Sequence, residues 1–179
     1  MTSGRVARLE IKTADELGGL HSPERRAERR AARETALMGT IYRLFVARGG
    51  PIPVADVRTA VGDGRTYATD RALAMFDEDD VIRLRDGVID IAYPFASKPT
   101  PFAVRLAGGA ERYACCAMDA LGMAPMLGQR IEIRSRCHHG GEALAFDATP
   151  HGASADAAAL MVWFGRRGPE DRGKVADGL

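Results

Sequence analysis

Residues 81–95 read VIRLRDGVIDIAYPF, and this stretch decides the fold of the first half of the chain. Two short runs rich in valine and isoleucine flank Asp86-Gly87, a dipeptide typical of the two-residue turn that joins antiparallel strands. The pattern predicts a β-hairpin whose turn lies at these two residues.

Three helices are expected before the hairpin. The first covers residues 22–48, with Ser22 as its N-cap and a proline at its first helical position. A short helix follows in residues 51–62 and a third in residues 65–80, each with apolar side chains at helical spacing. Three helices closed by a hairpin predict a winged helix-turn-helix-like domain over residues 22–95.

A second domain is expected from the proline-rich segment 96–102, which is typical of a join between domains. The pattern after it predicts a strand, a turn at Gly108-Gly109, a helix, and then two strands in which apolar and polar residues alternate. The segment 153–167 is expected to form a helix or a final strand. Residues 96–168 are therefore predicted to be a small α+β domain.

The two ends of the chain carry little that could be buried. Residues 1–21 are polar and irregular and predict a flexible arm, and residues 169–179 predict a loose tail. The sequence contains no apolar run of the length that a signal peptide or a membrane span needs. The chain is therefore expected to be cytoplasmic, with no membrane partner.

The composition is that of a folded protein without strong net charge. Of 179 residues, 46% are hydrophobic, which excludes a wholly disordered chain. The 25 basic and 24 acidic residues give a net charge of +1, so the composition as a whole favours neither a nucleic-acid-coating protein nor a membrane-surface protein. Any such binding would have to be local.

All three cysteines lie within residues 113–142, where the candidate chemistry is concentrated. Cys116 and Asp119 are spaced so that they would lie one turn apart on one face of the first turns of a helix. A thiolate there could hold a soft electrophile while the acid handles a proton. The other candidate ligands for a soft metal ion, such as mercury, copper or zinc, are Cys115, Cys137 and His138.

Each of these residues also has a structural interpretation. A cysteine is often a small, buried apolar residue, and Asp119 could satisfy the dipole at the start of a helix or pair with an arginine. A histidine in a glycine-flanked loop, such as His138, is often only part of a solvated turn. The residue types alone leave both interpretations open.

The order of the motifs resembles that of the alkylmercury (organomercurial) lyase family. The matching residues are Thr100-Pro101, Tyr113-Ala114-Cys115-Cys116-Ala117-Met118-Asp119-Ala120-Leu121, Leu127-Gly128, and Ser135-Arg136-Cys137 followed by Gly140 and Gly141. The resemblance covers about residues 35–165. It implies a winged-helix-like domain joined to a small α+β core of the alkylmercury lyase type.

The resemblance implies protonolysis of the carbon–metal bond of a small organomercurial, with no cofactor required. Two cysteine thiolates would take the mercury, because thiolates are soft ligands for soft metals, while an aspartate delivers the proton. Cys116 would be the first thiol and Asp119 the proton donor. The family's second catalytic cysteine, near its C-terminus, has no counterpart here, since the comparable stretch AALMVWFGRR contains no cysteine. Cys137, Cys115 or an external thiol would have to replace it.

Two other functions stay open. The chain could hold a soft metal ion without catalysis, or it could be a transcriptional regulator that joins a winged helix to a thiol or metal sensor. DNA is not the expected partner, because glutamates alternate with the arginines of the first helix and an acidic run fills residues 77–80. The Cys116-Asp119 pair favours the lyase-like function, because a simple metal holder has no obvious use for the acid.

Overall fold

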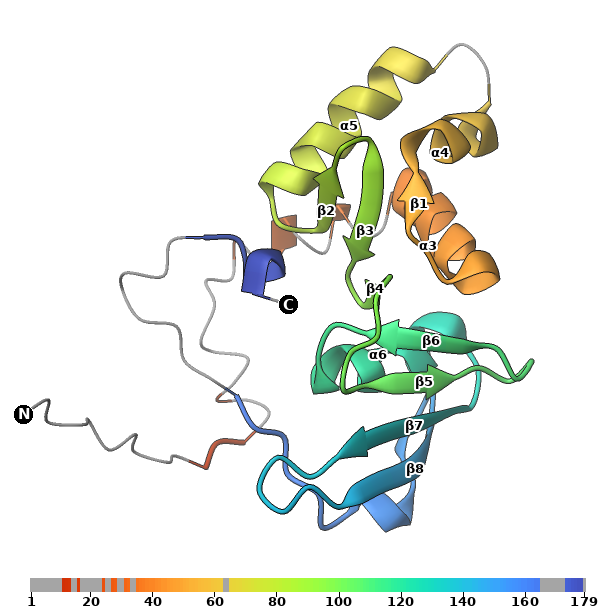
Figure 1. Cartoon of the computed structure of the whole chain (residues 1–179). Helices are drawn as coiled ribbons and strands as arrows, with labels where there is room; N and C mark the ends of the chain where they lie inside the picture. The colour runs from red at the N-terminus through yellow and green to blue at the C-terminus, as the bar shows by residue number, and fades with distance from the viewer. Residues whose placement is uncertain are drawn as a thin grey trace, which may run out of the picture.

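The computed structural model has helices packed around an antiparallel sheet, as the α+β prediction requires (Figure 1). It describes residues 11–13, 16, 24, 27–28, 31–32, 35–62, 65–164 and 173–178. Within these residues nine strands join into one sheet. None of the helices in this described part is long and apolar enough to cross a membrane.

Three helices build the first half in the predicted order: α3 (Ala36–Arg48), α4 (Val54–Val61) and α5 (Thr66–Glu78). The prediction of one unbroken helix over residues 22–48 is wrong, because α3 begins only after Thr35. Thr35 has extended backbone, and its hydroxyl accepts a hydrogen bond from the amide of Met38 at 3.2 Å. Threonine is a good N-cap and therefore starts a new helix here. The predicted Ser22 cap lies outside the described residues.

The hairpin lies where the sequence predicts it. Strands β2 (Ile82–Arg85) and β3 (Val88–Ala92) pair antiparallel around Asp86 and Gly87, whose φ angles are 50° and 73°. Two consecutive left-handed residues are typical of the type I′ turn, a conformation that aspartate tolerates and glycine adopts at no steric cost. A short strand that was not predicted, β1 (Ile52–Pro53), also pairs with β3.

The sheet continues without a break from the hairpin into the second half of the chain. Strand β4 (Phe95–Ala96) pairs both with β3 and with β6 (Glu111–Ala114). The order beyond β6 is β5 (Ala103–Arg105), β7 (Ile131–Arg136), β8 (Ala143–Thr149) and β9 (Gly152–Ala153). The predicted domain boundary after residue 95 therefore falls inside β4, within a hydrogen-bonded ladder.

Phe95 lies at the centre of the joint between the two halves. Its side chain is fully buried, and its ring stacks on Phe45 of α3 with 5.6 Å between the centroids and 17° between the planes. The ring of Tyr42 lies 6.1 Å away. Buried residues of the helices, the hairpin and the second half belong to the same apolar core. One core thus stabilises both halves.

Arg112 fastens α3 to the sheet. It extends from β6, and its Nε donates to the carbonyl oxygens of Phe45 at 2.8 Å and Val46 at 3.0 Å, in the last turn of α3. The Phe45 carbonyl also accepts from the amide of the C-cap residue Gly49 at 2.8 Å, and carbonyls at the end of a helix carry partial negative charge, which the Arg112 cation stabilises. Burial lowers the pKa of Arg112, although a guanidinium remains charged.

We expect Arg112→Met to lower the free energy of unfolding by about 1–3 kcal/mol, because hydrogen bonds from a charged group to part-buried carbonyls are lost. Urea unfolding followed by circular dichroism measures the change. Arg136→Met is the matched control, since Arg136 also donates to a carbonyl, that of Gly141, but from an exposed position. Its change should stay within about 0.5 kcal/mol. Equal changes in the two variants would contradict the role of Arg112.

The segment 153–167 differs from its prediction. Strand β9 ends at Ala153, a 3₁₀ turn covers Ala155–Ala157, and residues 158–164 have no regular structure. Residues 160–164 are five consecutive apolar residues. Neither a helix nor a strand could place all five side chains on one buried face. All five are exposed in the structure.

Residues 174–177 contact the first half, whereas the sequence predicts a loose tail over residues 169–179. A 3₁₀ turn, η2, covers Val175–Gly178, and Ala176 within it is fully buried. Figure 1 shows this turn, in blue, beside β2.

Candidate thiol site at the start of helix α6

Cys116 caps the helix that carries Asp119. Helix α6 (Ala117–Leu127) begins after a short bend that follows β6. Cys116 has extended backbone (φ −150°, ψ 179°), and its Sγ accepts a hydrogen bond from the Asp119 amide at 3.4 Å. Cys116 is thus the N-cap and not, as the spacing suggested, part of the first helical turn. Serine and threonine usually fill this position, and Asp119 takes the place of the acid in a capping box.

The capping geometry still brings a thiol and a carboxylate together. Both residues are half-buried. Burial raises the pKa of Cys116 to about 11, and the charge of Asp119 and a side-chain hydrogen bond with it act in the same direction. Backbone N–H groups oppose this rise only in part. At neutral pH Cys116 is therefore a protonated thiol beside the Asp119 side chain.

Cys115 lies in different surroundings from its neighbour. It is 4% exposed and belongs to a buried cluster with Ile91, Tyr93 and Ala96. Its amide donates to the carbonyl of Pro94 at 3.0 Å. Burial, more than the neighbouring charges, raises the pKa of this thiol. Cys115 is accordingly a neutral core residue in this conformation.

Thr100 fixes the backbone just before the two thiols. Its hydroxyl donates to the carbonyl of Ala114 at 2.6 Å and accepts from the amide of Phe102 at 3.1 Å. The sequence marked Thr100 only as part of a family motif. No local pattern could have indicated its partner, because Ala114 lies 14 residues further along the chain.

Cys137 leaves the sheet at the same edge as Cys116. Strands β6 and β7 both pair antiparallel with β5, where Ala103 faces Tyr113 on one side and Arg134 on the other. Cys116 lies three residues after Tyr113, and Cys137 lies three residues after Arg134. Because β6 and β7 run in the same direction, both cysteines follow strand ends on the same side of the sheet. About 10 Å, which is two strand spacings, separates those strands.

His138 does not join the cysteines. Its exposed ring stacks on Trp163, with 6.0 Å between the centroids and 12° between the planes. In the described part of the chain, no three histidine, cysteine, aspartate or glutamate side chains come close enough to hold one metal ion. The four candidate ligands of the sequence analysis are therefore not gathered into one site: Cys115, Cys116, Cys137 and His138.

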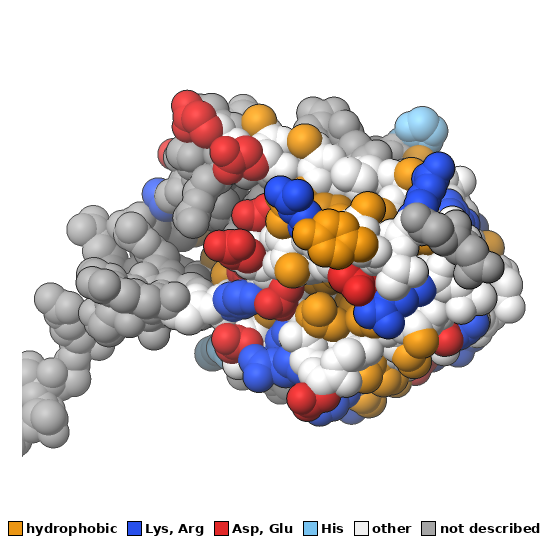
Figure 2. Space-filling model, turned by 90° about the horizontal axis from the view of Figure 1, so that it is seen from above, with side chains coloured by type: hydrophobic (Ala, Val, Ile, Leu, Met, Phe, Trp, Pro, Cys, Tyr) orange, Lys and Arg blue, Asp and Glu red, His pale blue; other side chains and the backbone are white. Residues whose placement is uncertain are grey.

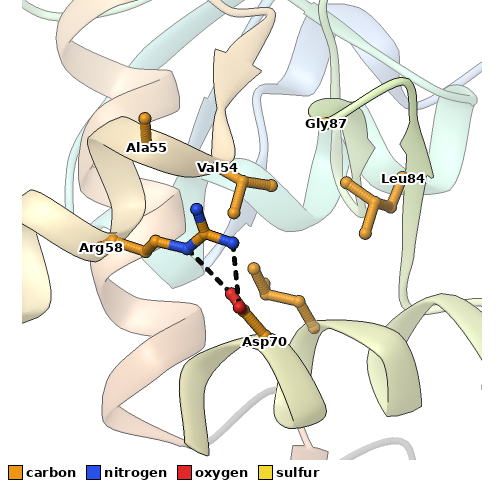
Figure 3. A pocket seen from close by; sticks show the side chains of 7 residues that line it. Val54, Ala55, Arg58, Asp70, Leu84 and Gly87 are labelled. Carbon is orange, nitrogen blue, oxygen red and sulfur yellow. Dashed lines mark hydrogen bonds and ion pairs between the residues drawn. The ribbon is translucent and has the colours of Figure 1, made fainter. Parts of the chain in front are cut away.

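A hollow of about 480 Å³ lies elsewhere, between α4, α5 and the hairpin (Figure 3). Arg58 and Asp70 meet there through two hydrogen bonds of 2.9 Å. Both side chains are more than 40% exposed, so this ion pair adds little to stability. The residues that line the hollow include no cysteine, and the thiols thus lie outside it.

Two sequence comparisons find the same family, and a structural comparison finds a similar fold. Residues 95–178 match the family model described as alkylmercury lyase. The alkylmercury lyase of Staphylococcus epidermidis is 25% identical over 106 residues, which are 59% of this chain and 47% of that relative. The crystal structure of the mercury-bound form of MerB2 is similar in fold, with a TM-score of 0.56 and 17% identity over 74% of this chain and 66% of that one. The chain thus spans about half the length of the curated relative.

Proposed function

Residues 95–178 match the alkylmercury lyase family, and from this premise we propose that the chain cleaves the carbon–mercury bond of a small organomercurial. Cys116 is the proposed mercury ligand and Asp119 the proposed proton donor. The observation that carries the proposal is that Cys116 caps the helix that bears Asp119: the Asp119 amide donates to Cys116 Sγ at 3.4 Å, and the Asp119 side chain raises the pKa of the thiol. We further propose that α3–α5 and β1–β3 form a winged-helix-like unit that packs on the second half of the chain through the shared core and does not bind DNA.

The chemistry begins with exchange at mercury. A sulfur–mercury bond forms at Cys116, the labile ligand of the organomercurial leaves, and the thiol proton passes to the Asp119 carboxylate. An external thiolate then adds to mercury as a second ligand, and the two electron-rich sulfurs weaken the bond between mercury and carbon. Asp119 returns the proton to that carbon, the electron pair of the carbon–mercury bond forms the new carbon–hydrogen bond, and the hydrocarbon leaves. A high thiol pKa suits this cycle, because Cys116 enters it with its proton still in place.

An external small thiol is the proposed second sulfur ligand. Two thiolate sulfurs on one metal ion lie at most about 4.6 Å apart, whereas about 10 Å separates the backbones of the strands that lead to Cys116 and Cys137, so the two side chains would have to point directly at each other. The loop after β7 is also held by hydrogen bonds, since the Cys137 amide donates to Glu142 O at 2.8 Å and its carbonyl accepts from Gly141 at 2.9 Å. Cys115 is not the proposed second ligand either, because its side chain is buried in the protein.

The test is release of benzene from phenylmercuric acetate in the presence of excess small thiol. Wild type and Cys137→Ser are expected to release benzene at similar rates, and Cys116→Ser to release none above the rate of the thiol alone. If Cys137→Ser also failed to release benzene, Cys137 and not an external thiol would be the second sulfur ligand. Benzene release by Cys116→Ser at the wild-type rate would overturn the proposal.

A second candidate is a protein that holds mercury without cleaving it. It is favoured by the capping role of Cys116 and Asp119, which gives both residues a structural use that needs no turnover. Stoichiometric mercury binding with no benzene release would select this candidate. A DNA-binding regulator has less support, because acidic and basic side chains intermix over the helix and hairpin end of the molecule (Figure 2).

A further inference from the structure

Residues 174–177, here called the C-terminal clasp, bind the surface formed by the end of α5 and the turn that follows it. Lys174 pairs with Asp77 at 2.5 Å. The amides of the next two clasp residues donate to the Asp80 carboxylate at 2.9 and 3.4 Å. Asp77 also accepts from the amide of Leu84 at 2.9 Å, so the acidic run of the sequence has structural partners.

The second half of the clasp contacts two arginines of β2. Arg83 donates to the carbonyl of Ala176, and Arg85 pairs with Asp177. Arg83 is itself held in place by Asp90 at 2.8 Å. The lysine of the clasp thus meets an acid and its aspartate meets a base, an arrangement that fixes the direction and register of the segment.

The apolar contact of the clasp is with the cluster that contains Cys115. Ala176 is fully buried, and it belongs to the same cluster as Cys115, Ile91, Tyr93 and Ala96. This cluster is separate from the large core that contains Phe95. Its C-terminal member is held in place by the polar contacts of residues 174–177 and not by a strand or a long helix.

We propose that the clasp is a removable cover for Cys115. While the clasp is docked, soft electrophiles cannot reach this thiol, and when the clasp lifts, Cys115 becomes a second reactive sulfur beside Cys116. The inference concerns the accessibility of a thiol, so it stands or falls independently of the proposed lyase reaction.

The two ion pairs of the clasp are only partly buried, which favours opening of the clasp without unfolding of the protein. In the ion pair of Arg85 and Asp177 the side chains are 59% and 42% exposed, and exposed pairs are weak and screened by salt. The segment forms only one turn of 3₁₀ helix at the surface (Figure 1). Lifting it would expose the cluster around Cys115 and leave the large core intact.

The test is the rate of alkylation of each cysteine by iodoacetamide in the folded full-length chain. In this reaction a sulfur–carbon bond forms, iodide leaves, and the thiol proton goes to the buffer. Timed quenching and peptide mass spectrometry give separate rates for the three cysteines. In wild type Cys115 should react most slowly, and 1 M NaCl should accelerate it more than it accelerates Cys137.

Ala176→Glu should raise the alkylation rate of Cys115 at least tenfold, because a carboxylate cannot occupy the buried position of the methyl group. Ala158→Glu makes the same change at an exposed site and should leave the rate unchanged. If circular dichroism shows that Ala176→Glu is unfolded, the double variant Lys174→Glu, Asp177→Lys decides, because these two side chains are 34% and 42% exposed and neither belongs to the apolar cluster. A Cys115 rate equal to wild type in the folded variant would overturn the inference.

Discussion

Alkylation of Cys116 is expected to accelerate about a thousandfold between pH 7 and pH 10. Only the thiolate reacts, and below a pKa of about 11 the thiolate fraction grows about tenfold with each pH unit. Because burial and Asp119 both favour the neutral form, the folded-state pKa lies above the unfolded value of about 9. Because the thiol ionises at a lower pH in the unfolded state than in the folded state, the free energy of unfolding falls as pH rises from about 9 to 11.

The measurement is a set of timed iodoacetamide reactions across this pH range, with Cys116 followed by peptide mass spectrometry. The chain unfolded in guanidinium is the internal control, and there the rate should level off above about pH 9, the ordinary cysteine value. Asp119→Asn should make Cys116 react about tenfold faster at pH 8, the effect of about one pKa unit, because it removes a negative charge beside the thiolate. A slower reaction in this variant would contradict the assigned cause of the pKa shift.

Phe95→Ala is expected to lower the free energy of unfolding by about 3–5 kcal/mol, the usual cost of removing a fully buried phenylalanine. The ring fills the joint between α3 and the sheet, and its loss leaves Phe45 without its stacking partner. Urea or thermal unfolding of the variant beside wild type measures the change.

Phe164→Ala is the matched control for this prediction. It removes the same atoms from a side chain that is 45% exposed, so it should cost much less than the change at Phe95. Similar costs at both positions would mean that Phe95 does not hold the two halves together.

Much of the fold was predictable because its signals are local. The Asp86-Gly87 turn, the helix of residues 54–61 and the alternating strand over residues 131–136 each follow from neighbouring residues, and all three are confirmed. The break at Thr35 was missed because the helical pattern continues on both sides of a residue that caps as readily as it continues a helix. Strands of two residues, such as β1 and β4, are too short to produce a pattern.

The site was predictable in its residue types but not in its geometry. Spacing correctly brought Cys116 and Asp119 together, yet it could not indicate that the thiol would cap the helix. Cys115 is buried and Cys116 is only half-buried because the two residues lie on different sides of the bend before α6. The hydrogen-bond partner of Thr100 depends on how the strands pair. The docking of Ala176 depends on contacts between residues more than 90 positions apart, and no sequence pattern encodes these.

We expect strand β4 to couple the fluctuations of the two halves of the sheet. Its two residues are paired with the helical half along one edge and with the thiol-bearing half along the other, so neither half can come apart as an autonomous unit without breaking this ladder. Backbone amides on both sides of β4 should therefore exchange with solvent through the same cooperative opening. The lifetime of the arrangement around Cys116 is then set by the stability of the whole chain, including helices that contribute no atom to the site.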